Sequence, residues 1–77
     1  MNMQQIKEAL EAKGFEVSEE LARQGYELYT LKAEGESLPA NDKKALEAFT
    51  QKWTRFCETN TLWHIADQIG YKAGLWA

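Results

Sequence analysis

The sequence predicts a small α+β fold, in the order helix, two-stranded antiparallel hairpin, long helix and short helix. Apolar residues recur at three- and four-residue spacing in residues 2–13, 42–58 and 61–70, which is the pattern of amphipathic helices. Residues 26–31, Tyr-Glu-Leu-Tyr-Thr-Leu, are instead rich in aromatic and β-branched types, which strands favour. A chain of 77 residues is long enough for one core, so we expect residues 1–77 to form a single domain.

The first helix has clear signals at both of its ends. Asn2 can cap its N-terminus, and Leu10 belongs to its apolar side. Gly14 suits the left-handed residue that follows a helix, and Phe15 would then contact Leu10 in a Schellman ending. We therefore expect a helix over residues 2–13.

Residues 15–33 carry two competing patterns. Residues 15–18 alternate like the start of a strand, and residues 26–31 suit a second strand after a turn. The alternative is a short helix that begins at Ser18 and ends at Gly25, which would give an all-α bundle. We favour the hairpin, which needs a helix over one face because two strands alone are not stable in water.

The longest predicted helix covers residues 42–58 and follows a loop at residues 34–41. Asn41 is the expected N-cap, and the loop contains the single proline, Pro39. Four large apolar residues form one continuous stripe along this helix: Leu46, Phe49, Trp53 and Phe56. We interpret the stripe as core; the alternative is the seam of a homodimer, which needs the same spacing.

A last helix is expected over residues 61–70, with Gly70 at its end. The tail that follows, residues 71–77, is apolar for a chain end. Ends fray unless they are tied down, so Leu75 and Trp76 either dock on the core or are held for a partner. We favour docking, because a buried Trp adds a large apolar area to so small a core.

The composition excludes several classes of protein. Cys57 is the only cysteine, so no internal disulfide can form, and together with His64 it is too little for the usual metal sites. No run approaches the roughly 20 apolar residues of a membrane span, and the N-terminus does not resemble a secretory signal. We expect a cytoplasmic protein with no metal, no cofactor and no membrane contact. Short chains often gain stability from a partner subunit, so a homo-oligomer such as a homodimer is a further expectation.

Residues 62–77 resemble the first helix and the turn of a helix-turn-helix motif. Ala66 would be the small residue inside the first helix, and Gly70 would make the turn, with apolar residues on either side. The segment after the turn is truncated and holds one basic residue, Lys72. The resemblance implies a DNA-binding regulator that uses Lys72, which is our alternative function. The net charge of −3 does not favour a nucleic-acid partner.

No pattern along the chain indicates a catalytic site, so we expect no enzyme activity. Cys57 adjoins the apolar stripe and is most simply an inert small hydrophobe. The chain is rich in aromatic residues, and residues 1–36 hold eight Glu against four Lys or Arg. We expect a small non-enzymatic protein-interaction module, namely an adaptor, an antagonist (inhibitor) or a subunit that covers a surface of another macromolecule. The expected contacts are three aromatic residues and an acidic rim: Trp63, Tyr71, Trp76, Glu16, Glu19 and Glu20.

Overall fold

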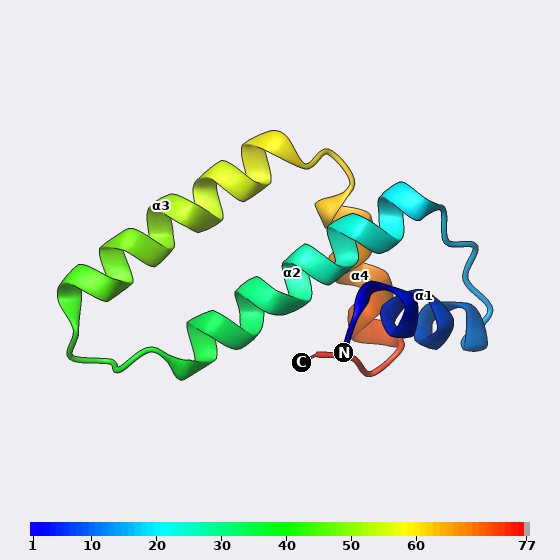
Figure 1. Cartoon of the computed structure of the whole chain (residues 1–77), viewed down its shortest axis with the longest axis horizontal. Helices are drawn as coiled ribbons and strands as arrows, with labels where there is room; N and C mark the ends of the chain where they lie inside the picture. The colour runs from blue at the N-terminus through cyan, green and yellow to red at the C-terminus, as the bar shows by residue number, and fades with distance from the viewer. Residues whose placement is uncertain (77) are drawn as a thin grey trace.

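The computed structural model of the chain describes residues 1–76, which form four helices and no strand (Figure 1). The α+β prediction with its two-stranded hairpin is therefore wrong, and the all-helical alternative describes the fold. The helices are α1 (Met3–Ala12), α2 (Glu19–Ser37), α3 (Lys43–Thr59) and α4 (Trp63–Lys72). Within the described part of the chain, no helix is both long enough and apolar enough to cross a lipid bilayer.

Helix α2 takes the place of the predicted hairpin. Ser18 caps it, because its Oγ accepts a hydrogen bond of 3.1 Å from the backbone N–H of Leu21. The helix then continues past Gly25, where the alternative prediction ended it, as far as Ser37. Its buried residues repeat with helical spacing along one face: Leu21, Ala22, Gln24, Gly25, Leu28 and Leu31. Burial of this face outweighs the strand preference of residues 26–31, which depends strongly on context.

Helix α1 forms as its end signals predict, within one residue at each end. Asn2 accepts a hydrogen bond from the backbone N–H of Gln5, and the Gln5 side chain bonds back to the backbone N–H of Asn2, which completes a capping box. At the other end Gly14 has a φ of 90°, and the backbone N–H of Phe15 donates to the carbonyl of Leu10. The Schellman ending is therefore confirmed.

The other helix boundaries differ from the prediction. Asp42, and not Asn41, caps α3, because its carboxylate accepts a hydrogen bond from the backbone N–H of Ala45. Helix α4 begins later than expected and continues through Gly70 to Lys72. Its C-terminal turn uses a later glycine, since Gly74 has a φ of 78°. Gly70 therefore lies inside α4 and does not end the helix.

The core forms where α1 and α4 both approach α2 at Gly25. A Cβ at Gly25 would lie 3.5 Å from the Cγ2 of Ile6 on α1 and 3.9 Å from the Cβ of Ala66 on α4. Small residues at this crossing let the helix backbones come close together. The completely buried side chains surround the same point: Ile6, Leu10, Leu28 and Ala66.

Buried polar side chains attach the α3–α4 turn to α2. The Oε1 of Gln24 accepts a hydrogen bond of 2.7 Å from the backbone N–H of Leu62. The Nδ2 of Asn60 donates to the carbonyl of Phe56 at 2.9 Å, which also accepts a hydrogen bond from the backbone N–H of Asn60. Arg23 reaches the Oδ1 of Asn60 at 3.4 Å. Asn60 therefore ends α3.

The described part of the C-terminal tail folds back on α4. Trp76 lies over Gly70, and its indole N–H donates to the carbonyl of Asp67 at 3.2 Å. The backbone N–H of Leu75 donates to the carbonyl of Gly70 at 2.9 Å, which completes the turn. The predicted docking of Leu75 and Trp76 is what the structure shows, and Gly70 is required because the Trp76 ring occupies the place of a side chain.

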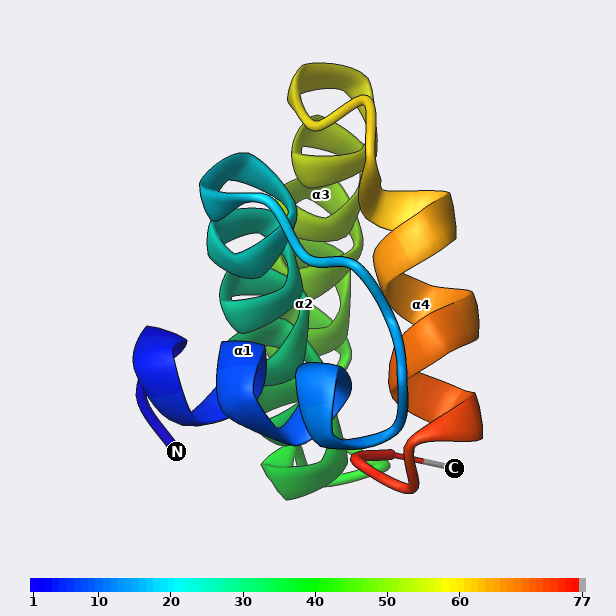
Figure 2. The same ribbon diagram turned by 90° about the vertical axis from the view of Figure 1, so that its right-hand side faces the viewer.

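Helices α2 and α3 form a helical hairpin that projects beyond the part of the molecule covered by α1 and α4 (Figures 1 and 2). The molecule measures 40 × 22 × 18 Å, and its radius of gyration is 13.0 Å. A compact chain of this length would have a radius of gyration of about 11.5 Å. The tip of the helical hairpin, residues 38–42, therefore has no helix packed over it.

Two glycine substitutions should distinguish Gly70, whose Cβ position is filled by the Trp76 ring, from Gly25, which has room for a Cβ. Gly70→Ala would place a Cβ inside the Trp76 ring, so we expect it to displace the tail and lower the free energy of unfolding by about 1–3 kcal/mol. Gly25→Ala meets only ordinary contacts and improves helix propensity, so we expect no loss and a gain of up to about 1 kcal/mol. Urea unfolding followed by circular dichroism measures both. Equal stability of the two variants would contradict the packing described for Trp76.

Candidate functional site

The apolar face of α3 is only partly covered. Of the four residues in its stripe only Phe56 is buried, while Leu46 keeps 36% of its surface exposed. Phe49 and Trp53 are half-buried. Phe49 reaches α2 at Gly35, where a Cβ would lie 2.7 Å from the Cζ of its ring. The ring therefore rests on bare backbone, and α3 is joined to α2 by side chains across a gap.

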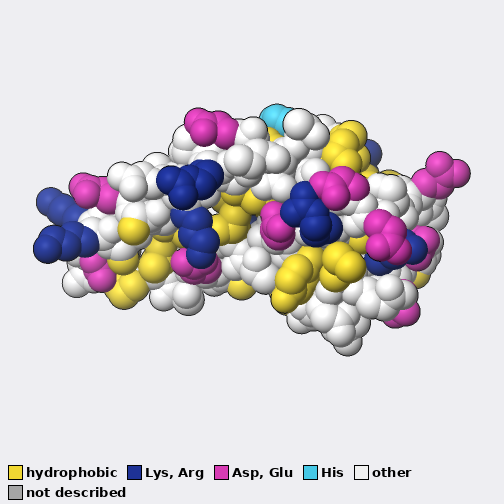
Figure 3. Space-filling model, turned by 45° about the horizontal axis from the view of Figure 1, so that its top comes forward, with side chains coloured by type: hydrophobic (Ala, Val, Ile, Leu, Met, Phe, Trp, Pro, Cys, Tyr) yellow, Lys and Arg dark blue, Asp and Glu magenta, His cyan; other side chains and the backbone are white. Residues whose placement is uncertain are grey.

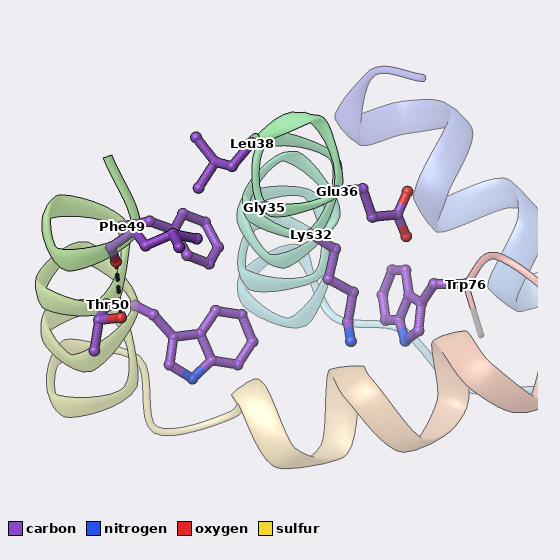
Figure 4. A pocket seen from close by; sticks show the side chains of 9 residues that line it. Lys32, Gly35, Glu36, Leu38, Phe49, Thr50 and Trp76 are labelled. Atoms are coloured by element: carbon purple, nitrogen blue, oxygen red, sulfur yellow. Dashed lines mark hydrogen bonds between the residues drawn. The ribbon is translucent and has the colours of Figure 1, made fainter. Parts of the chain in front are cut away.

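This gap forms an apolar groove of about 480 Å³ between α2 and α3 (Figure 4). We call it the α2–α3 groove. Its walls come from both helices, the tip and the C-terminal tail: Lys32, Gly35, Glu36, Leu38, Leu46, Phe49, Thr50, Trp53 and Trp76. The lining is mainly aromatic and aliphatic, with three polar side chains at the rim. Aromatic anchors inside a polar rim are typical of protein-binding surfaces.

Trp76 and Lys32 close the end of the groove nearest to the core. The Nζ of Lys32 lies 5.7 Å from the centre of the Trp76 ring and 3.2 Å from the Oδ1 of Asp67. Figure 4 shows Lys32 and Trp76 side by side, with Glu36 one turn along α2. On α3 the hydroxyl of Thr50 donates to the carbonyl of Leu46 within the same helix. The groove thus has a fixed aromatic wall at one end and is uncovered at the tip.

The opposite face of the helical hairpin is more polar. There Lys52 forms an ion pair with Glu34 at 2.7 Å, and Arg55 lies nearby on the same side of α3. Charged side chains of both signs are spread over the surface of the molecule in Figure 3, with hydrophobic patches between them. The two faces of the hairpin therefore differ, because one is bridged by charges and the other holds the apolar groove.

The three aromatic residues expected to contact a partner lie in different places. Trp63 stacks on His64 with ring centres 3.8 Å apart and meets Trp53 edge-on at 6.0 Å, so it helps to attach α4 to α3. Tyr71 keeps 65% of its surface exposed on α4. Trp76 forms the end wall of the groove. Only Trp76 belongs to the groove itself, and sequence analysis missed the contributions of Gly35 and Leu38, for which the sequence carried no signal.

The expected acidic rim is exposed and lies outside the groove. Glu16, Glu19 and Glu20 are at the beginning of α2 or just before it. Glu20 pairs with Arg23 and accepts a hydrogen bond of 3.0 Å from Gln24, and these contacts lower its pKa to about 2. The same pair raises the pKa of Arg23. Glu20 is therefore engaged within α2, and its charge is largely compensated there.

The groups with chemical reactivity do not form a site. Burial raises the pKa of the Cys57 thiol, which favours its neutral form. The His64 ring stacks on the Trp63 indole. Within residues 1–76 no three His, Cys, Asp or Glu side chains are placed to hold a metal ion.

The segment that resembles a helix-turn-helix folds as one helix and a tight turn. Gly70, the expected turn residue, lies inside α4, and Lys72 is in the last turn of that helix. Residues 73–76 turn back onto α4 and do not form a second helix. The arrangement that the motif requires for reading a DNA groove is therefore not formed by these residues.

Comparisons with known proteins add no relative. No protein-family model, no curated protein and no solved structure matches this chain.

The lowered pKa of Glu20 predicts an acid-sensitive start of α2. Its charged form is favoured in the folded chain, so its contribution to stability is complete above its ordinary pKa of 4.5 and is lost as the pH falls through about 2. We expect Glu20→Gln to be less stable than the wild type at neutral pH, with the difference shrinking over this range. Thermal unfolding at several pH values measures it. Glu19→Gln is the matched control, and an equal effect of both substitutions would contradict the specific pairing of Glu20.

Proposed function

We propose that this protein is a small non-enzymatic protein-interaction module that binds another polypeptide in the α2–α3 groove. The observation that carries the proposal is the partly uncovered stripe of α3, where Leu46 is exposed and Phe49 and Trp53 are half-buried beside an apolar cavity. A monomer gains little from a strongly amphipathic helix whose apolar face stays in water. An exposed apolar region with a polar rim instead marks a site of protein contact.

The lining of the groove suits an aliphatic or aromatic side chain of a partner. Trp53 and Trp76 offer large apolar surfaces, and Trp is among the residues that contribute most to binding energy at interfaces. Trp76 is held by its hydrogen bond to Asp67 and by its place over Gly70, so little of its freedom would be lost on binding. A rigid wall of this kind favours affinity through preorganisation.

The proposal revises which residues make the contact. Trp76 remains a contact residue, while Trp63 supports the groove from behind by packing against Trp53. Tyr71 and the acidic residues of α2 lie outside the groove and would contact only a partner that extends beyond it. The free thiol of Cys57 is consistent with a reducing compartment, and we propose that the protein works in the cytoplasm.

A photo-crosslinking residue placed in the groove tests this proposal. Benzoylphenylalanine at Thr50, an exposed position on the groove rim, should form an adduct with a protein of the source cell. The same residue at Ala48, which is exposed on another side of α3, is the matched control and should form little or no adduct. Gel electrophoresis and mass spectrometry measure the adducts and the site of attachment.

Two further measurements make the result specific. An excess of unmodified protein should compete with the adduct formed at Thr50, and Leu46→Glu in the same chain should reduce it at least about tenfold, because a charge replaces an apolar contact. If the adducts formed at positions 50 and 48 are equally strong, or if neither position forms one, the groove is not the binding site.

A further inference from the structure

We propose that the polypeptide in the α2–α3 groove is a second copy of this chain, in a two-fold dimer whose helical hairpins run antiparallel. The inference rests on the proposed function, because it names the partner of the same groove. The chain leaves more surface exposed than a compact monomer would. It exposes 5272 Å², whereas a compact monomer of its mass would expose about 4,800 Å².

This excess is comparable with what a dimer needs. Two chains together expose roughly 1,000 Å² more than two compact monomers would, and about 1,000 Å² is the lower bound for a specific interface. The excess arises from the projecting hairpin, since α1 and α4 cover only the first half of α2 (Figure 1). If the two hairpins buried each other, the excess surface of each projecting hairpin would no longer be exposed to water.

The shape of the groove selects one symmetric arrangement. If α3 of the second copy lay over α2, it would meet α4, which packs on α2 at Gly25, and the C-terminal tail, whose Trp76 lines the end of the groove. If the second copy instead runs antiparallel, with α2 over α2, it enters from the open tip. Its own tip then reaches Trp76 and stops there. The residue that it would bring to this wall is Leu38, an apolar residue that lines the groove.

Charges at the rim are self-complementary in the antiparallel arrangement. When two identical helices pair antiparallel about a two-fold axis, a residue that lies a given number of positions before the axis faces the residue that lies the same number of positions after it in the other copy. With the two-fold axis at the level of Glu34, Lys32 of one copy faces Glu36 of the other, and the symmetry repeats this pair. Both side chains border the groove. Glu36 has no ion pair among the described residues, so it is available for this contact.

The dimer is tested first by mass as a function of concentration. Sedimentation equilibrium of the full chain should show a transition from 8.8 kDa to twice that mass. Thr50→Arg, on the groove rim, should weaken the dimer by about tenfold or more, because a charged side chain would enter an apolar interface. Gln51→Arg makes a similar change at a position of α3 that does not line the groove and should leave the dimer unchanged. Circular dichroism checks that both variants remain helical.

A charge exchange tests the antiparallel register. Lys32→Glu alone and Glu36→Lys alone should each weaken self-association by about tenfold or more, because each homodimer would contain two like-charge contacts. When the two variants are mixed, opposite charges face each other again, so a heterodimer should form. The Lys32→Glu chain lacks the ion pair with Asp67 both alone and in the mixture. Rescue on mixing therefore reports the contact between the two chains and not this ion pair.

The outcomes separate this inference from the proposed function. A chain that stays at 8.8 kDa at all concentrations, while Thr50 still crosslinks to a different protein, overturns the second copy and leaves the groove as a binding site. A dimer that is indifferent to Thr50→Arg, or that shows no rescue on mixing, forms elsewhere or in another register and also overturns it. A chain with neither a dimer nor an adduct at Thr50 overturns both proposals.

Discussion

The close approach of three helices at Gly25 is the contact on which the rest of the structure depends. At this position α2 has no side chain, and Ile6 of α1 and Ala66 of α4 both lie within van der Waals range of the place where a Cβ would be. The contact places both covering helices over the first half of α2. The second half of α2 and the first half of α3 are consequently less covered by α1 and α4, which produces both the elongated shape and the α2–α3 groove.

Signals that depend on neighbouring residues predicted local structure well. The capping box at Asn2 and the Schellman ending at Gly14 involve contacts within a few residues, and both are present. The predicted hairpin failed because burial of one face of α2 outweighs the strand preference of residues 26–31, which depends on context. Gly70 was misjudged because Trp76 covers it only after the chain turns back on α4. The identity of a glycine does not show whether it ends a helix or lies under a packed side chain.

The candidate site could be predicted only in part. The apolar stripe of α3 was evident from its spacing, and both interpretations of it, core and interface, apply to different residues. Phe56 is buried in the core, whereas Leu46 remains exposed. The groove also needs Gly35 as the floor under Phe49 and Trp76 as the end wall, and these residues come from distant parts of the chain. No local pattern could have joined them.

The arrangement of the three tryptophans has a consequence for spectroscopy. Trp53 and Trp63 lie 6.0 Å apart with their rings inclined at 71°, a geometry in which two indoles exchange excitation energy and share their electronic transitions. Trp76 lies at the end of the groove beneath the Lys32 ammonium, in a different electrostatic environment. The chain therefore carries two optical reporters without any label. The circular dichroism of the indole pair follows the docking of α4 on α3, and the emission of Trp53 and Trp76, which both line the groove, follows the occupancy of the groove.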